Sequence, residues 1–145
     1  MVRKTRFVVA LIVLAFLPVA VTPAQETANL GDLIRETGAH KISGFVTLGL
    51  ATAAAASSFF GEEVHEPLAY ATTGMSVVTL TLGTIAYADY FPVAWPHIVL
   101  NALGTTAFLI NAFALEGGST AHIATGAAGI ASMFAALGAI VMIMR

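Results

Sequence analysis

The chain has no cysteine among its 145 residues, and only 10% of its residues are charged. The absence of cysteine excludes disulfides, iron–sulfur clusters, thiolate metal sites and c-type haem attachment. The formal net charge is −2 and no Lys/Arg stripe suited to phosphates is present, so nucleic acid is not an expected partner. The chain also lacks a nucleotide-binding loop and a flavin motif, which excludes a self-contained reductase.

What the chain has in abundance is apolar sequence. Hydrophobic residues make up 58% of it and the mean hydropathy is +0.88, which indicates a small integral membrane protein in contact with lipid. Four apolar runs each approach the ~20 residues that carry a helix across a bilayer. They cover residues 40–60, 67–88, 96–115 and 121–144. Short links make consecutive helices antiparallel, so we expect an all-α, up-down-up-down bundle of four transmembrane helices over residues 39–145.

The first segment of the chain resembles a targeting sequence. Three basic residues precede an apolar run over 7–21, and small residues follow it, which predicts a signal peptide at 1–24. An uncleaved anchor helix is the alternative. Residues 25–38 form a polar lead-in, either disordered or containing a short interfacial helix. If the first hydrophobic segment sets the orientation, the mature protein lies in a bacterial inner membrane with both ends in the periplasm.

Four histidines are the candidate site residues. His40, His65, His97 and His122 each lie at or just before an apolar run. The first and third are 57 residues apart, and so are the second and fourth. In a bundle of alternating direction, this spacing predicts one histidine pair near each membrane face. Ionisable side chains within membrane helices are usually functional.

The predicted helical faces beside the histidines are small or weakly polar. They include Gly44, Gly104 and Gly126, together with Asn101 on the third helix. Small residues let membrane helices pack closely. They also leave room for a flat porphyrin between two imidazoles that bind its iron axially. The second interpretation accounts for the histidines as well as for the glycines.

The segments 40–50 and 122–126, each with a glycine four residues after its histidine, and the one-histidine-per-helix pattern resemble the short bacterial members of the cytochrome b561 family. The resemblance covers residues 38–144. It implies two b-type haems, with His40/His97 and His65/His122 as axial ligand pairs to iron, and it implies transmembrane electron transfer.

The same resemblance bears on substrates and partners. Family members that use ascorbate keep basic residues at the substrate surface, whereas here Arg35 and Lys41 lie near one predicted haem only, where they are candidates for binding its propionates. Ascorbate is therefore disfavoured. A quinone at one end and a periplasmic or extracellular electron carrier at the other are the expected partners. The chain would be at most a quinol or small-reductant oxidoreductase subunit, as a homo-oligomer or in a larger redox complex.

Two other functions remain open from the sequence. In a metal or proton transporter the histidines would line a path, but such a path favours polar or carboxylate residues at the midplane, where three of the runs carry only Ser, Thr and Ala. In a non-catalytic membrane assembly subunit the histidines would be replaceable. A visible spectrum of the purified protein distinguishes these from a cytochrome.

Overall fold

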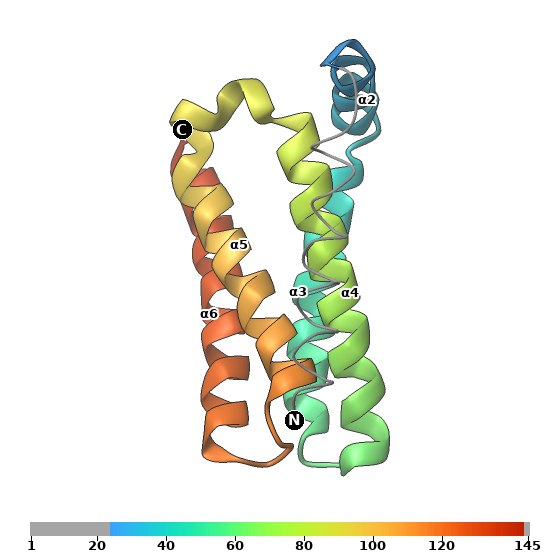
Figure 1. Ribbon diagram of the computed structural model, residues 1–145, viewed down its shortest axis with the longest axis vertical. Coiled ribbons are helices and arrows are strands. Elements are labelled where there is room, and N and C mark those ends of the chain that lie inside the picture. The colour runs from blue at the N-terminus through green and yellow to red at the C-terminus, as the bar shows by residue number, and fades with distance from the viewer. Residues whose placement is uncertain (1–23, 144–145) are drawn as a thin grey trace.

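The computed structural model describes residues 24–143, with side chains described from residue 30 onward (Figure 1). Over that range the chain is helical and has no strand, which confirms the all-α prediction there. The elements are α2 (Ala24–Thr37), α3 (Ala39–Ser57), α4 (Glu62–Ala86), the 3₁₀ helix η1 (Ala88–Tyr90), α5 (Phe91–Ala114) and α6 (Thr120–Ile143). The predicted signal peptide lies outside the described residues, except for its last residue, which begins α2.

Glycines with positive φ separate the helices. Gly38, Gly61 and Gly118 have φ values of 66°, 100° and 72°, which residues with a Cβ rarely adopt. Both α4 and α5 begin five residues earlier than predicted, and each runs through a proline, Pro67 or Pro96, in its second turn. A proline at that point removes one backbone hydrogen bond while the preceding turn stays intact. Two of the four histidines consequently lie within their helices rather than at the start.

The four long helices form two antiparallel hairpins, α3–α4 and α5–α6, joined by η1 (Figure 1). Packing is most extensive within each hairpin, and α4 also packs on α5. Contacts between α3 and α6 close the ring. Since each helix packs on its ring neighbours, α3 lies diagonal to α5 and α4 lies diagonal to α6.

The bundle has a mixed interior and a largely apolar surface. Among the described residues, ten polar side chains are buried, including Thr47, Ser76 and Asn101, beside apolar ones such as Phe108 and Met133. Large apolar side chains such as Ile42, Leu103 and Ile123 are more than half exposed. A water-soluble bundle exposes fewer large apolar side chains, because apolar surface is costly in water. In a membrane, lipid covers the apolar side chains, and buried hydroxyls and amides hydrogen-bond between helices.

Three helical segments in the described part of the chain are long and apolar enough to cross a membrane: Glu62–Ala86, Ala88–Ala114 and Thr120–Ile143. The sequence predicted four such segments. The fourth, α3, has 19 residues, carries His40 and Lys41 near its start, and continues largely with Ala, Ser, Thr and Gly. With two ionisable residues near its start, this short helix has no stretch apolar enough to be counted with the other three.

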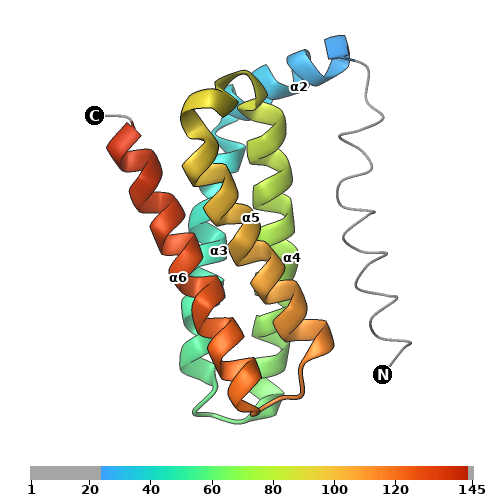
Figure 2. The same ribbon diagram turned by 60° about the vertical axis from the view of Figure 1, so that its left-hand side comes forward.

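The lead-in is helical rather than disordered, because α2 packs against α4 and α3. It passes the end of α4 and projects to one side of the bundle, at a steep angle to the long helices (Figure 2). Ile34 is buried in this contact. The Arg35 guanidinium donates hydrogen bonds to the Ala86 carbonyl at the end of α4 and to the Asp32 carboxylate.

Candidate functional site

The structure brings together the two histidine pairs predicted from their equal spacing. The ring centroids of His40 on α3 and His97 on α5 are 5.9 Å apart, with an angle of 89° between the ring planes. The centroids of His65 on α4 and His122 on α6 are also 5.9 Å apart, at 66°. Both contacts are made across a diagonal of the bundle, one near each of its ends. All four histidines are half-buried.

Backbone carbonyls orient three of the four imidazoles. The Nδ1 atom of His40 lies 3.0 Å from the Thr79 carbonyl oxygen on α4. The Nδ1 atom of His97 lies 2.8 Å from the carbonyl oxygen of Ala136, on α6. A carbonyl oxygen can only accept, so Nδ1 carries the proton in both rings. The lone pair of each Nε2 is then an acceptor, as a metal ligand requires, although that of His97 already lies 3.5 Å from the Asn101 amide nitrogen.

The His65 ring is held in the same way from within its own hairpin. Its Nδ1 donates to the Ala54 carbonyl oxygen at 2.8 Å, and the Ser57 hydroxyl oxygen is 3.4 Å away. His122 differs from the other three, because its Nδ1 is buried and has no hydrogen-bond partner. Its backbone is anchored instead: its N–H donates to Ser119 Oγ at 3.1 Å, and its carbonyl accepts from the Asn111 side-chain amide.

The hydrogen bonds reveal an internal repeat. His40 and Thr79 are 39 residues apart, and so are His97 and Ala136. Donor and acceptor of the second bond are thus each 57 residues after those of the first, the same interval that separates the two histidines. The positive-φ glycines of the two hairpin loops, Gly61 and Gly118, have the same separation. The two hairpins are therefore equivalent units that each contribute one histidine to each pair.

The ring separation is close to that of two imidazoles sharing one metal ion. With metal–nitrogen bonds of ~2.1 Å and ring nitrogens ~1.1 Å from the centroid, linear coordination places the centroids roughly 6.4 Å apart. The observed 5.9 Å in each pair is shorter than that, and the two rings of each pair are in T-shaped contact. Residues 24–143 contain no group of three or more His, Cys, Asp or Glu side chains placed to hold a metal ion. The histidines occur as pairs, the number of protein ligands that a six-coordinate haem iron takes.

Three of four glycines on the histidine-bearing helices allow close packing. A Cβ at Gly83, which sequence reasoning missed, would lie 2.6 Å from His40 Cε1 and 2.9 Å from its Nδ1, so this glycine makes room for the imidazole. A Cβ at Gly104 would meet Met133 Cγ at 3.0 Å, so this glycine allows close contact between α5 and α6. Gly126 packs against the Asn111 amide, and Gly44 has only ordinary contact with α4.

The predicted polar residues lie near one end. Asn101 is buried, its amide nitrogen is 3.5 Å from His97 Nε2, and its Oδ1 has no partner. Lys41 is exposed. Arg35 binds Asp32 and the end of α4, so its guanidinium is already engaged in holding α2.

An aromatic neighbour of the His40 pair was also missed by sequence reasoning. The Tyr87 ring lies 5.6 Å from the His40 ring, edge to face. Tyr90 in η1 follows 6.2 Å beyond Tyr87. In the sequence these tyrosines look like ordinary interfacial aromatics. Only the return of α4 to the start of α3 places them beside the histidine.

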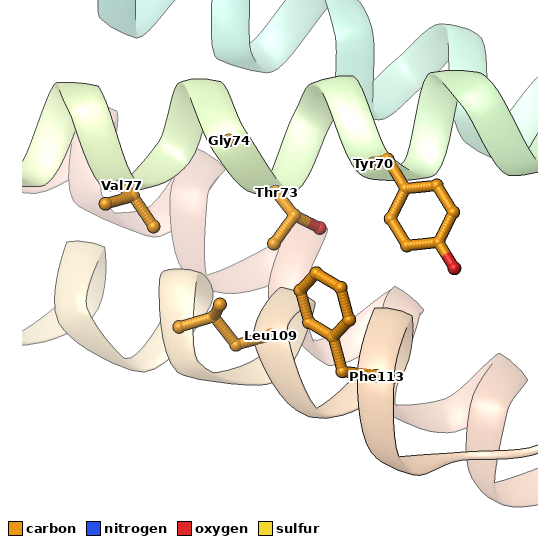
Figure 3. A pocket seen from close by; sticks show the side chains of 6 residues that line it. All are labelled: Tyr70, Thr73, Gly74, Val77, Leu109 and Phe113. Atoms are coloured by element: carbon orange, nitrogen blue, oxygen red, sulfur yellow. The ribbon is translucent and has the colours of Figure 1, made fainter. Parts of the chain in front are cut away.

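An apolar recess of about 200 Å³ lies between α4 and α5 (Figure 3), and none of the four histidines lines it. Tyr70, Thr73, Gly74 and Val77 line it from α4, and Leu109 and Phe113 line it from α5. The Thr73 hydroxyl donates to the Ala69 carbonyl at 2.8 Å, so the recess offers an incoming ligand almost only apolar contacts.

Comparisons with protein-family models, with curated proteins and with solved structures each give no match. The resemblance to the cytochrome b561 family therefore remains a prediction from the histidine pattern.

Proposed function

We propose that the protein is a transmembrane electron carrier that binds two b-type haems, one between His40 and His97 and the other between His65 and His122. The observation that carries the proposal is the repeated pair geometry: two imidazoles from diagonal helices, 5.9 Å apart at each end of the bundle. The relation to the cytochrome b561 family is part of the same proposal. Bound haem iron supplies reversible one-electron chemistry.

The residues around the histidines fit such a group. Hydrogen bonds from Nδ1 to the carbonyls of Thr79, Ala136 and Ala54 orient three rings and raise the basicity of Nε2. Gly83 provides space for the His40 ring. The partnerless Asn101 Oδ1 beside His97 is a polar atom that a bound group or water would satisfy.

The membrane arrangement belongs to the proposal as well. We take α3 to be the fourth span, because its 19 residues extend ~29 Å and it packs within the bundle along α4. The two histidine pairs are then ~25 Å apart along the membrane normal, because Ser57, whose hydroxyl lies 3.4 Å from His65, is 17 positions after His40 on α3. We place the protein in a bacterial inner membrane with both mature ends in the periplasm. Its expected partners are a quinone and a periplasmic or extracellular carrier.

The first test is the visible spectrum of the full-length protein, purified from haem-replete cells, before and after reduction with dithionite. We expect two haems per chain and the sharp reduced bands of bis-histidine haem b. A colourless protein, with or without bound zinc, refutes the proposal, and bound zinc favours the transporter.

The second test uses the predicted pairing. His40→Ala and His97→Ala should each remove the same haem, and the double variant should lose no more than either single variant. His65→Ala should remove the other haem. Thr52→Ala, an exposed change on α3, is the control and should keep both. Loss of different haems from the first two variants contradicts the pairing.

A further inference from the structure

The two hairpins differ in how the second histidine of each is held. In the first hairpin, His65 Nδ1 donates to the Ala54 carbonyl at 2.8 Å. The residue 57 positions after Ala54 is Asn111, whose side-chain amide donates to the carbonyl of His122. The Nδ1 of His122 is left buried without a partner. Three of the four imidazoles thus have a carbonyl acceptor on Nδ1, and His122 has none.

A second difference accompanies the first. A Cβ at Gly126 would lie 3.2 Å from the Asn111 amide nitrogen, so the glycine makes room for that amide. The residue equivalent to Gly126 in the first hairpin is Ala69, and the one equivalent to Asn111 is Ala54. Each hairpin therefore has one matched pair of side chains, Ala54 with Ala69 or Asn111 with Gly126. The polar pair is found where the Nδ1 bond is missing.

The Nδ1 bond has an electronic consequence for a metal-bound imidazole. Donation of the Nδ1 proton to a carbonyl increases the basicity of Nε2. A more basic axial ligand stabilises the ferric state over the ferrous state, and hydrogen bonding around the ligands is one of the means by which a protein adjusts a haem potential. Loss of the bond at one of two axial ligands therefore favours reduction of that haem.

We propose that Asn111, accommodated by Gly126, is a positioning residue that keeps His122 Nδ1 from a carbonyl acceptor and so raises the reduction potential of the haem between His65 and His122. The inference rests on the proposed function, because it requires that haem. Asn111 and Gly126 change the potential of this haem relative to a hairpin that lacks them. The absolute potentials of the two haems also depend on nearby charges, which are acidic loop residues beside this site and Arg35 and Lys41 near the other.

The test exchanges the matched pairs. Asn111→Ala with Gly126→Ala gives the second hairpin the residues of the first, and His122 should gain the carbonyl of residue 111 as an acceptor. In potentiometric titrations of the two-haem protein, we expect one haem to become about tenfold harder to reduce, a fall of ~59 mV for one electron. The other haem, on His40 and His97, should keep its potential. Haem content should stay at two per chain.

The reciprocal exchange is the matched control. Ala54→Asn with Ala69→Gly should free His65 Nδ1 and raise the potential of the same haem, the opposite sign. Asn111→Ala alone serves where the double variant does not fold, and should lower that potential. Unchanged potentials, or equal shifts of both haems, overturn the inference. Failure of the unmodified protein to bind haem instead overturns the proposed function, on which the inference depends.

Discussion

Replacing Gly83 with alanine tests the link between helix packing and the His40 site. The new Cβ would lie 2.6 Å from His40 Cε1, 2.9 Å from Nδ1 and 3.3 Å from Nε2. Carbon atoms in contact prefer ~3.5–4.0 Å, so the ring must move by roughly 1 Å. Overpacking of this kind costs ~1–3 kcal/mol. The shift also weakens the bond to the Thr79 carbonyl, worth about 0.5–1.5 kcal/mol.

Alanine recovers part of that cost, because it favours a helix over glycine by ~1 kcal/mol. The net loss is about 1–3 kcal/mol, which corresponds to roughly fivefold to a hundredfold weaker haem binding at the His40/His97 pair. Haem per chain, measured after dialysis against a haem-binding competitor, should therefore fall from two toward one. Gly74→Ala in the same helix is the matched control, since a Cβ there meets no atom within 4 Å. Retention of both haems in Gly83→Ala, with unchanged thermal stability, would refute this reasoning.

Two further changes test the packing and the attachment of α2. Gly129→Ala places a Cβ 2.7 Å from the buried Phe108 ring, so we expect the free energy of unfolding to fall by ~1–3 kcal/mol. Gly138→Ala is the control, because a Cβ there meets no atom within 4 Å, and the free energy of unfolding should stay unchanged or rise. Thermal melts in detergent measure both variants. Arg35→Ala removes the hydrogen bond from α2 to the end of α4 and should speed proteolysis within Ala24–Thr37 without loss of haem. Loss of one haem from that variant would instead favour a role for Arg35 in propionate binding.

Several features could be predicted from local sequence. Apolar runs, short links and turn glycines indicate four antiparallel helices, because hydrophobic periodicity and helix-ending residues act over a few neighbours. The predicted starts of α4 and α5, at Pro67 and Pro96, are later than the observed ones. A proline indicates that a helix boundary is near, but it does not show whether a helical turn precedes it. The run that forms α3 is less apolar than its length suggests, because it includes His40, Lys41 and several hydroxyl side chains.

The sequence by itself also determined the pairing of the histidines. Helices one and three run in the same direction, as do helices two and four. Equal intervals of 57 residues therefore place His40 at the same end of the bundle as His97, and His65 at the same end as His122. Those are the ring contacts found. The number of residues between two histidines and the alternation of helix direction both follow from the order of residues along the chain.

Only the tertiary structure decided which atoms surround each imidazole. The carbonyl acceptors of His40 and His97 are 39 residues further along the chain and belong to residues, Thr79 and Ala136, whose side chains give no sign of the bond. The space beside His40 depends on Gly83, and the exception at His122 depends on Asn111. Backbone groups carry no residue identity, and their alignment with a ring depends on the rotation and depth of two packed helices, which are fixed only when the helices meet.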